Sequence, residues 1–195
     1  MKISKTKIEG VLLIEPKIFG DDRGYFTETF RKDLFENVVG HKVDFIQDNE
    51  SKSSFGVLRG LHYQLPPFSQ SKLVRVIEGS VLDVAVDIRK GSPTYGKYVA
   101  IELSDENKKQ LFVPRGFAHG FLVTSPTAIF SYKVDNYYAP EYDRGILYND
   151  FTIGIDWNIE LEKVLLSDKD TKQPLLANAE VFDFSDNLYN EKYYE

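Results

Sequence analysis

The chain contains no cysteine among its 195 residues. This absence excludes disulfide bonds, thiolate catalysis and zinc sites built from cysteine. Long apolar runs are also missing, so no segment reaches the length that spans a bilayer. The apolar run at residues 11–14 is too short to be the core of a signal peptide. We therefore expect a soluble, cytoplasmic protein that does not enter a membrane.

Basic charge is scarce as well, because 24 lysine and arginine residues stand against 30 aspartate and glutamate residues. The net charge of −6 argues against a nucleic-acid partner, which usually meets a basic surface. The sequence also lacks a glycine-rich nucleotide-binding loop and a Gly-x-Ser-x-Gly motif. A tightly held nucleotide cofactor and a serine nucleophile are thus unsupported, whereas a small anionic ligand stays open.

The pattern of the chain predicts one all-β domain over residues 1–195, with a core at about 1–175 and a C-terminal extension at about 176–195. Short β-prone segments alternate with turns that contain Gly and Pro, which is typical of a sandwich or barrel. Strands are predicted at residues 11–14, 25–30, 43–49, 73–77, 81–88, 98–103, 110–113, 119–123, 128–134 and 153–157, with a loop at 51–56.

Helix is expected in few places. Residues 31–39 carry an apolar stripe and are followed by Gly40, a common helix stop. Asn158 is placed to cap a helical turn that continues to residue 164, and a short helix is expected near residues 176–180.

Two predicted strands carry carboxylates on a face where they need a reason. Asp83 and Asp87 share one face of the strand at residues 81–88, so that face should line a polar site or meet water. Glu28 shares a strand face with Phe26 and Phe30. It either meets a polar ligand or partner, or it lies on an exposed edge.

His62 is the first candidate for chemistry, because only three histidines occur and this one lies in a β-prone run at residues 57–65. Histidine moves protons readily near neutral pH, and Arg59 and Lys72 could hold an anionic substrate beside it. A basic imidazole needs a carboxylate on its second nitrogen, for which Asp83 and Asp170 are candidates. The competing interpretation is a hydrogen-bonded histidine in the core.

Tyr132 is the candidate acid, since a tyrosine on another strand could return a proton from the side opposite His62. Its alternative role is packing within a strand. Metal chemistry is less well supported. The pattern Pro114-x-Gly116-x-x-His119 is similar to the second histidine motif of cupin barrels, but the first motif needs a second histidine that His62-Tyr63-Gln64 lacks. A metal held by the two histidines and Glu78 is a weak alternative, and we expect none.

Beyond single residues, ordered runs of the sequence closely resemble the dTDP-4-dehydrorhamnose 3,5-epimerases, a family with relatives that epimerise one carbon only. The resemblance implies a cupin-type jelly-roll barrel and a homodimer that exchanges N-terminal strands. It also implies a reaction without cofactor or metal, in which dTDP-4-keto-6-deoxy-D-glucose becomes dTDP-4-keto-L-rhamnose for rhamnose biosynthesis. The matching runs are residues 15–17, 19–21, 23–24, 47–53, 57–65, 72–75, 83–89, 114–122, 132–133, 137–138, 155–157, 166–167 and 169–170.

The same resemblance implies roles for particular residues. The family's base falls on His62, its acid on Tyr132 and the aspartate that orients the base on Asp170, while Lys72 matches a lysine near the keto oxygen. Asp143 stands where related enzymes carry a glutamate contact. Glu28 and the segment around Tyr25 are implied to serve the partner subunit's site. The residues that match substrate ligands are Arg23, Glu28, Gln47, Asn49, Arg59, His119, Lys169 and Tyr138, the last of them stacking on thymine.

Three other functions stay open on the sequence. One is a single-carbon epimerase or ketoisomerase on a related dTDP-4-keto sugar, which the catalytic residues alone do not separate from the double epimerase. A second is a non-catalytic barrel that binds a nucleotide sugar, which would tolerate loss of His62, Tyr132 and Asp170. The third is a metal-dependent cupin, which a chelator would inactivate.

Overall fold

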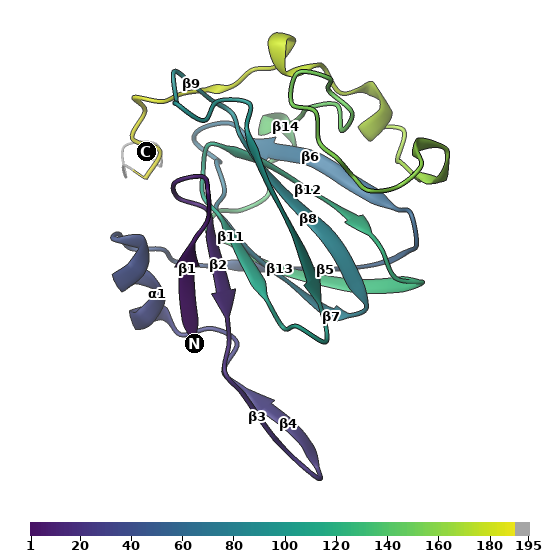
Figure 1. The fold of residues 1–195 in the computed structure, drawn as a ribbon. Coiled ribbons are helices and arrows are strands. Elements are labelled where there is room, and N and C mark those ends of the chain that lie inside the picture. Colours follow the sequence, from purple (N-terminus) through teal and green to yellow (C-terminus); the bar gives the residue numbers. More distant parts are fainter. Residues whose placement is uncertain (190–195) are drawn as a thin grey trace.

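Two antiparallel sheets form the body of the protein in the computed structural model, which describes residues 1–189 (Figure 1). The six-stranded sheet has the order β1 (Lys2–Lys5), β2 (Leu12–Glu15), β11 (Gln110–Val113), β7 (Lys72–Glu78), β13 (Thr127–Val134) and β5 (Gln47–Ser54). The five-stranded sheet has the order β10 (Tyr98–Ser104), β8 (Ser80–Asp87), β12 (Phe117–Val123), β6 (Leu58–Gln64) and β14 (Asp143–Gly145).

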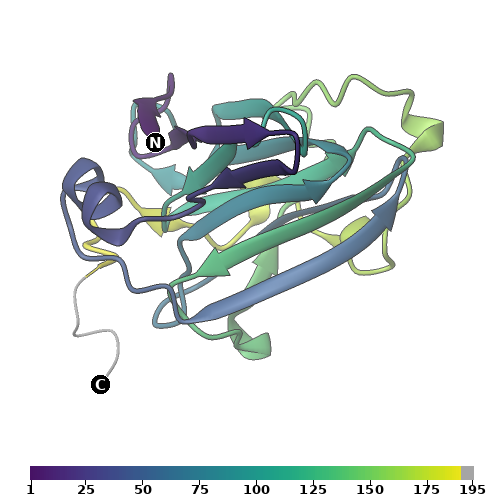
Figure 2. The same cartoon turned by 90° about the horizontal axis from the view of Figure 1, so that it is seen from below.

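The chain passes back and forth between the two sheets. β6 is followed by β7 in the other sheet, and β11, β12 and β13 alternate in the same way. This alternation gives the predicted jelly-roll barrel, in which many consecutive strands lie in opposite sheets. Figure 2 shows the long strands β5 and β13 side by side along one edge of this barrel.

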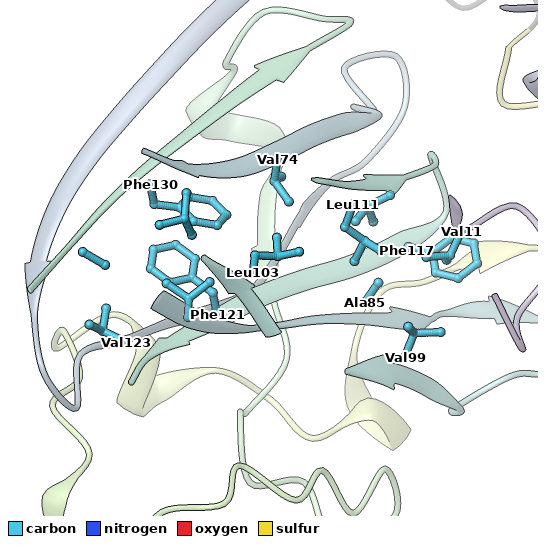
Figure 3. Close-up of a cluster of buried hydrophobic side chains, with 14 of the residues drawn as sticks. Val11, Val74, Ala85, Val99, Leu103, Leu111, Phe117, Phe121, Val123 and Phe130 are labelled. Carbon is cyan, nitrogen blue, oxygen red and sulfur yellow. The ribbon is translucent and has the colours of Figure 1, made fainter. Parts of the chain in front are cut away.

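The main core fills the space between the sheets. Strand β8 contributes to this core with every second residue. Its side chains alternate between the two faces of the sheet, and the apolar ones are buried on both faces. Val81 and Ala85 point inward and join Phe121 and Phe130, whose rings stack with centroids 4.0 Å apart (Figure 3). The outward set of β8 is also buried, under the segment that follows β14. Asp83 and Asp87, predicted to line a polar site or meet water, are both fully buried.

A short helix and a hairpin complete the N-terminal part. Helix α1 (Lys32–Val39) ends at Gly40, whose φ of 83° and N–H bond to the Glu36 carbonyl form a left-handed stop. Phe35 packs this helix on Leu12 and Phe112 of the six-stranded sheet. The hairpin of β3 (Ile18–Asp21) and β4 (Gly24–Thr27) projects away from the barrel (Figure 1).

The remaining elements are short and follow the barrel strands. One parallel pair joins β9 (Arg89–Lys90) to β15 (Phe182–Asp183). Four 3-10 turns are η1 (Pro140–Tyr142), η2 (Leu161–Lys163), η3 (Asp170–Lys172) and η4 (Leu176–Asn178). The last of them confirms the short helix expected near residues 176–180. Within residues 1–189, no helix is both long enough and apolar enough to span a membrane.

Several predicted elements were wrong in their bounds. The strand expected at 43–49 begins only at Gln47, because Val43 and Phe45 pack against α1, and it continues through the predicted loop to Ser54, because β13 pairs with it throughout. The strand expected at 25–30 ends at Thr27. No strand forms at residues 153–157, where Trp157 is buried in irregular chain. Asn158 has a φ of 54° and caps nothing, since the turn η2 begins after Glu160.

Candidate active site

A cavity of about 320 Å³ opens between the two sheets and gathers most of the predicted catalytic residues. Its lining combines the apolar rings of Phe121 and Phe130 with polar and charged side chains. Such a mixture suits a ligand with a planar or sugar part and a charged part. The lining residues are Glu50, Ser51, Arg59, His62, Lys72, His119, Phe121, Phe130, Tyr132, Ser167, Lys169 and Asp170.

A bulge in β6 brings Arg59 and His62 to the same cavity. Residues three apart in a regular strand point to opposite faces. Here His62 pairs with His119 and Arg59 pairs with Phe121, so two residues of β6 oppose Gly120 alone. Gly60 supplies the conformation with a φ of 142°, and a Cβ there would lie 2.5 Å from the Gly120 Cα. The extra residue therefore returns both functional side chains to the inner face.

His62 is held by a buried aspartate. Its Nε2 lies 2.5 Å from Asp170 Oδ1, and Ser167 Oγ donates to the other carboxylate oxygen at 2.8 Å. Burial favours a raised pKa for Asp170, but the hydrogen bonds from His62 and Ser167 outweigh it and hold the pKa below its ordinary value. Asp170 thus stays ionised at neutral pH and fixes the imidazole orientation, while Nδ1 is left for chemistry.

The second candidate partner of His62, Asp83, is engaged elsewhere. Its carboxylate lies 2.9 Å from Nε2 of His119, and both side chains are buried. Of the two candidates, Asp170 serves His62 and Asp83 does not, because β8 and β12 are adjacent and place Asp83 against His119 instead. His119 and its aspartate form a fixed polar group on the cavity wall next to His62.

Lys72 and Tyr132 enter the cavity from the six-stranded sheet, on β7 and β13. Burial lowers the pKa of Lys72 to about 8, against the charges of Asp143 and Asp83. Among residues 1–189, its ammonium has no hydrogen-bond or ion-pair partner. Burial raises the pKa of Tyr132, partly offset by the positive charge of Arg59. At neutral pH the site therefore presents a mostly protonated lysine and a protonated phenol.

Five of the predicted substrate ligands form a hydrogen-bonded group beside the cavity. Lys169, which lines the cavity, pairs with Asp143, and the Tyr138 hydroxyl donates to Asp143 at 3.1 Å. Gln47 accepts from the Tyr138 backbone N–H and donates to the Asn49 side chain. Tyr138 itself is 56% exposed, so its ring is free to stack on a planar group.

Arg23 and Glu28 are not brought to this cavity. Arg23 lies at the tip of the projecting hairpin and pairs with Asp21, two residues away. Glu28 follows β4 and is no part of the cavity lining. Within one chain, these two predicted ligands therefore lie apart from the other predicted site residues.

Sequence reasoning missed several residues that line or support the site. Ser167 was not singled out, although its spacing of three before Asp170 is a common hydrogen-bonding pattern at the start of a turn. Ser53 of β5, in a segment partly predicted to be loop, accepts hydrogen bonds from the Arg59 guanidinium, whose Nε and Nη2 lie 3.2 Å from Ser53 Oγ. Phe121 and Phe130 gave no local signal beyond β propensity. No group of three or more His, Asp or Glu side chains within residues 1–189 could hold a metal ion.

The arrangement suits proton transfer at a carbon next to a carbonyl. A base fixed by a carboxylate lies on one sheet, and a phenolic acid and a cation lie on the other. Proton removal from one face and return to the opposite face inverts a stereocentre. The cation lies in a cavity partly shielded from water, where it stabilises developing negative charge more strongly than it would in solvent.

Known proteins share both the sequence and this fold. A family model described as dTDP-4-dehydrorhamnose 3,5-epimerase matches residues 5–178. A protein of that name from Shigella flexneri is 55% identical over 182 residues, which cover 93% of this chain and 99% of that protein.

Two crystal structures extend this similarity to three dimensions. An epimerase from Legionella pneumophila, in complex with dTDP-4-keto-L-rhamnose, is 47% identical with a TM-score of 0.91 and covers 95% of this chain and 99% of that one. ChmJ, a 3'-monoepimerase from Streptomyces bikiniensis in complex with dTDP-quinovose, is 36% identical with a TM-score of 0.83 and covers 88% and 86%. On the length of the match and the identity to the Shigella protein, this chain belongs to the dTDP-4-dehydrorhamnose 3,5-epimerase family.

Proposed function

We propose that the chain inverts carbons 3 and 5 of dTDP-4-keto-6-deoxy-D-glucose and so produces dTDP-4-keto-L-rhamnose. The observation that carries this function is one cavity that brings together His62 of the five-stranded sheet, held by Asp170 of the turn η3, with Tyr132 and Lys72 of the six-stranded sheet. The relatives named as 3,5-epimerases, and the neighbour solved with dTDP-4-keto-L-rhamnose, support the substrate.

The first step is removal of a proton beside the ketone. The carbonyl at carbon 4 acidifies the C–H bonds at carbons 3 and 5, and His62 accepts one of these protons. The electron pair of the broken C–H bond moves into the ring and onto the carbonyl oxygen, which gives an enolate. The Lys72 ammonium stabilises that oxygen, a contribution of about 3–4 kcal/mol where one such donor has been removed in other enzymes.

The second step is return of a proton to the opposite face. The enolate carbon takes the phenolic proton of Tyr132, whose raised pKa keeps it protonated until then. The carbonyl re-forms, and solvent restores the proton of Tyr132 while His62 releases its own. The same two steps, proton removal and proton return, then take place at the second carbon. No oxidant or reductant is consumed, because substrate and product are isomers.

The nucleotide part of the substrate is held by the remaining polar residues. Arg59 and Lys169 supply positive charge to the diphosphate, although the whole protein is acidic. Tyr138 provides an exposed ring for thymine, next to Gln47 and Asn49. His119, fixed by Asp83, contacts the sugar or diphosphate from the cavity wall.

We further propose that the active form is a homodimer in which the β3–β4 hairpin reaches the partner's site. Ile18, Phe19, Tyr25 and Phe26 of this hairpin are between 46% and 70% exposed, which is a large apolar surface for one hairpin. Arg23 and Glu28 lie on or next to it and away from the cavity of their own chain. A second copy that covers the hairpin would bring both residues to a site.

The function is tested by proton NMR of the substrate in heavy water, with a reductase that traps the product. The proposed function predicts loss of both the carbon 3 and the carbon 5 proton signals and formation of dTDP-rhamnose. Dialysis against a chelator should leave the rate unchanged. Absence of exchange, with dTDP still bound, would instead indicate a binding protein.

A single-carbon epimerase is the second candidate, favoured by the close structural match to the monoepimerase ChmJ. The same NMR experiment separates the two functions. Exchange and inversion at only one carbon would assign the chain to this narrower activity.

A further inference from the structure

The C-terminal residues 180–189 lie beyond the span matched by the family model, yet two of their apolar side chains are buried. Phe182 and Leu188 are 3% and 7% exposed and belong to the cluster that covers the outside of the five-stranded sheet. In Figure 1 this yellow segment crosses one end of the barrel and ends on the side of α1. We refer to residues 180–189 as the tail.

One end of the tail contacts the strand that carries His62. The Tyr63 hydroxyl donates to the Glu180 carbonyl at 2.5 Å, and the Tyr63 ring packs on Phe182. Tyr63 follows His62 directly and points to the other face of β6. The Glu180 side chain also pairs with Arg144 of β14.

The other end of the tail contacts the residue before Lys72. Tyr189 is half-buried, and its hydroxyl lies 2.8 Å from Ser71 Oγ and accepts the Arg115 N–H at 3.1 Å. Its ring packs on His41, with centroids 4.0 Å apart. Ser71 has no exposed surface, and its own N–H donates to Asp135. Its hydroxyl thus has a specific partner in the tail.

Lys72 differs from the other site residues in what holds its side chain. His62 is held by Asp170 and Arg59 by Ser53, whereas the Lys72 ammonium has no hydrogen-bond or ion-pair partner within residues 1–189. Its position is therefore set by its backbone, and Lys72 is the first residue of β7. That strand end is paired with Val113 of β11 and Val134 of β13, and Ser71 is the residue directly before it, with a side chain that contacts the tail.

We infer that Tyr189 is a positioning residue that fixes Ser71, and through it the Lys72 ammonium, at the place where the enolate oxygen develops. The inference rests on the proposed role of Lys72. Because that charge is needed most in the transition state, a displaced Lys72 lowers kcat and leaves KM nearly unchanged.

The test compares Tyr189→Phe with Tyr98→Phe, both in the full-length protein. The first removes the hydroxyl but keeps the ring. The second removes the hydroxyl of Tyr98, a residue of β10 away from the cavity, where that hydroxyl accepts the Asp156 N–H. We expect a kcat lowered roughly ten-fold for Tyr189→Phe at unchanged KM, since small misplacements cost that much or more. Tyr98→Phe should match the wild type.

Two further variants identify the route. Ser71→Ala should lower kcat as much as Tyr189→Phe, and the double variant should be no slower than either, because both changes break one connection. If Tyr189→Phe kept the wild-type kcat while Lys72→Met was inactive, the inference about Tyr189 would be overturned, and the proposed role of Lys72 would stand. An active Lys72→Met would overturn the role of Lys72 itself, and with it this inference.

Discussion

His62 reaches the cavity with one nitrogen already bound to a buried carboxylate. We predict that His62→Ala lowers kcat by about 10²–10⁴-fold, the usual contribution of a positioned base. The affinity for dTDP should change little, because other residues bind the nucleotide. Steady-state kinetics and calorimetric titration with dTDP check the two parts. Near-normal turnover in this variant would mean that another residue is the base.

Tyr132 separates proton removal from inversion. We predict that Tyr132→Phe still exchanges the carbon 5 proton with solvent, because His62 is intact, but no longer inverts that carbon. NMR in heavy water measures the exchange, and the reductase-trapped product reports the stereochemistry. If the product of the variant were still fully inverted, Tyr132 could not be the acid.

Lys72 links activity to stability. Its folded pKa of about 8 lies below its ordinary value of 10.5, so the unfolded chain binds its proton more tightly. The resulting destabilisation is complete below pH 8 and is lost as the pH rises from 8 to 10.5. We predict that Lys72→Met inactivates the enzyme yet raises the free energy of unfolding at pH 7 by up to about 3 kcal/mol. Urea denaturation at pH 7 and pH 10 checks this, and an equal or lower stability at pH 7 would contradict it.

Single residues also mark how far local sequence carries. His62 could be nominated because only three histidines occur, whereas Tyr132 and Lys72 gained their catalytic roles mainly from the resemblance to a known family. The chemistry of the residues alone did not decide between Asp83 and Asp170, since that choice depends on which segments are neighbours in the fold, and only the family resemblance favoured Asp170. Asp170 is 108 positions from His62, and only the folded barrel brings them together.

Among the elements, β6 is the one on which the site depends. Its bulge requires Gly60 both for a positive φ and for the approach of Gly120. We predict that Gly60→Ala costs about 2–4 kcal/mol of stability and most of the activity. Gly40→Ala is the matched control, because Gly40 also has a positive φ but a Cβ there meets no atom within 4 Å. Equal losses in urea denaturation for the two variants would argue against the close approach.

Element boundaries show what the sequence pattern leaves open. Alternating strands such as β8 and β10, and helix α1 with its glycine stop, were predicted because their patterns are local. Strand β5 was misjudged because its polar sequence gains strand structure only from pairing with β13. Residues 153–157 looked like a strand, but Trp157 is buried and its indole N–H donates to the Tyr148 carbonyl in irregular chain. In both cases tertiary contacts outweighed propensity.

At the scale of the whole molecule, the two predicted ligands on and beside the hairpin remain unexplained by a single chain. Arg23 and Glu28 resemble substrate ligands in sequence, yet the β3–β4 hairpin carries Arg23 away from the barrel and leaves its apolar residues exposed. Both facts are consistent with exchange of the hairpin between two copies. A composition cannot indicate this, because exposed aromatic residues become informative only once the fold shows where they lie.

Mixing two inactive variants tests this exchange directly. His62→Ala lacks the base, and Arg23→Ala lacks the hairpin cation. In a mixed dimer, the site of the Arg23→Ala chain keeps its own His62 and receives an intact hairpin from its partner. We predict that equal amounts, mixed and allowed to exchange subunits, recover about a quarter of wild-type activity, since half the dimers are mixed and each has one complete site. Light scattering should show a dimer throughout, and His62→Ala mixed with Lys72→Met serves as the control, because neither chain then has a complete barrel site. If Arg23 acts within its own chain, mixing it with His62→Ala recovers nothing.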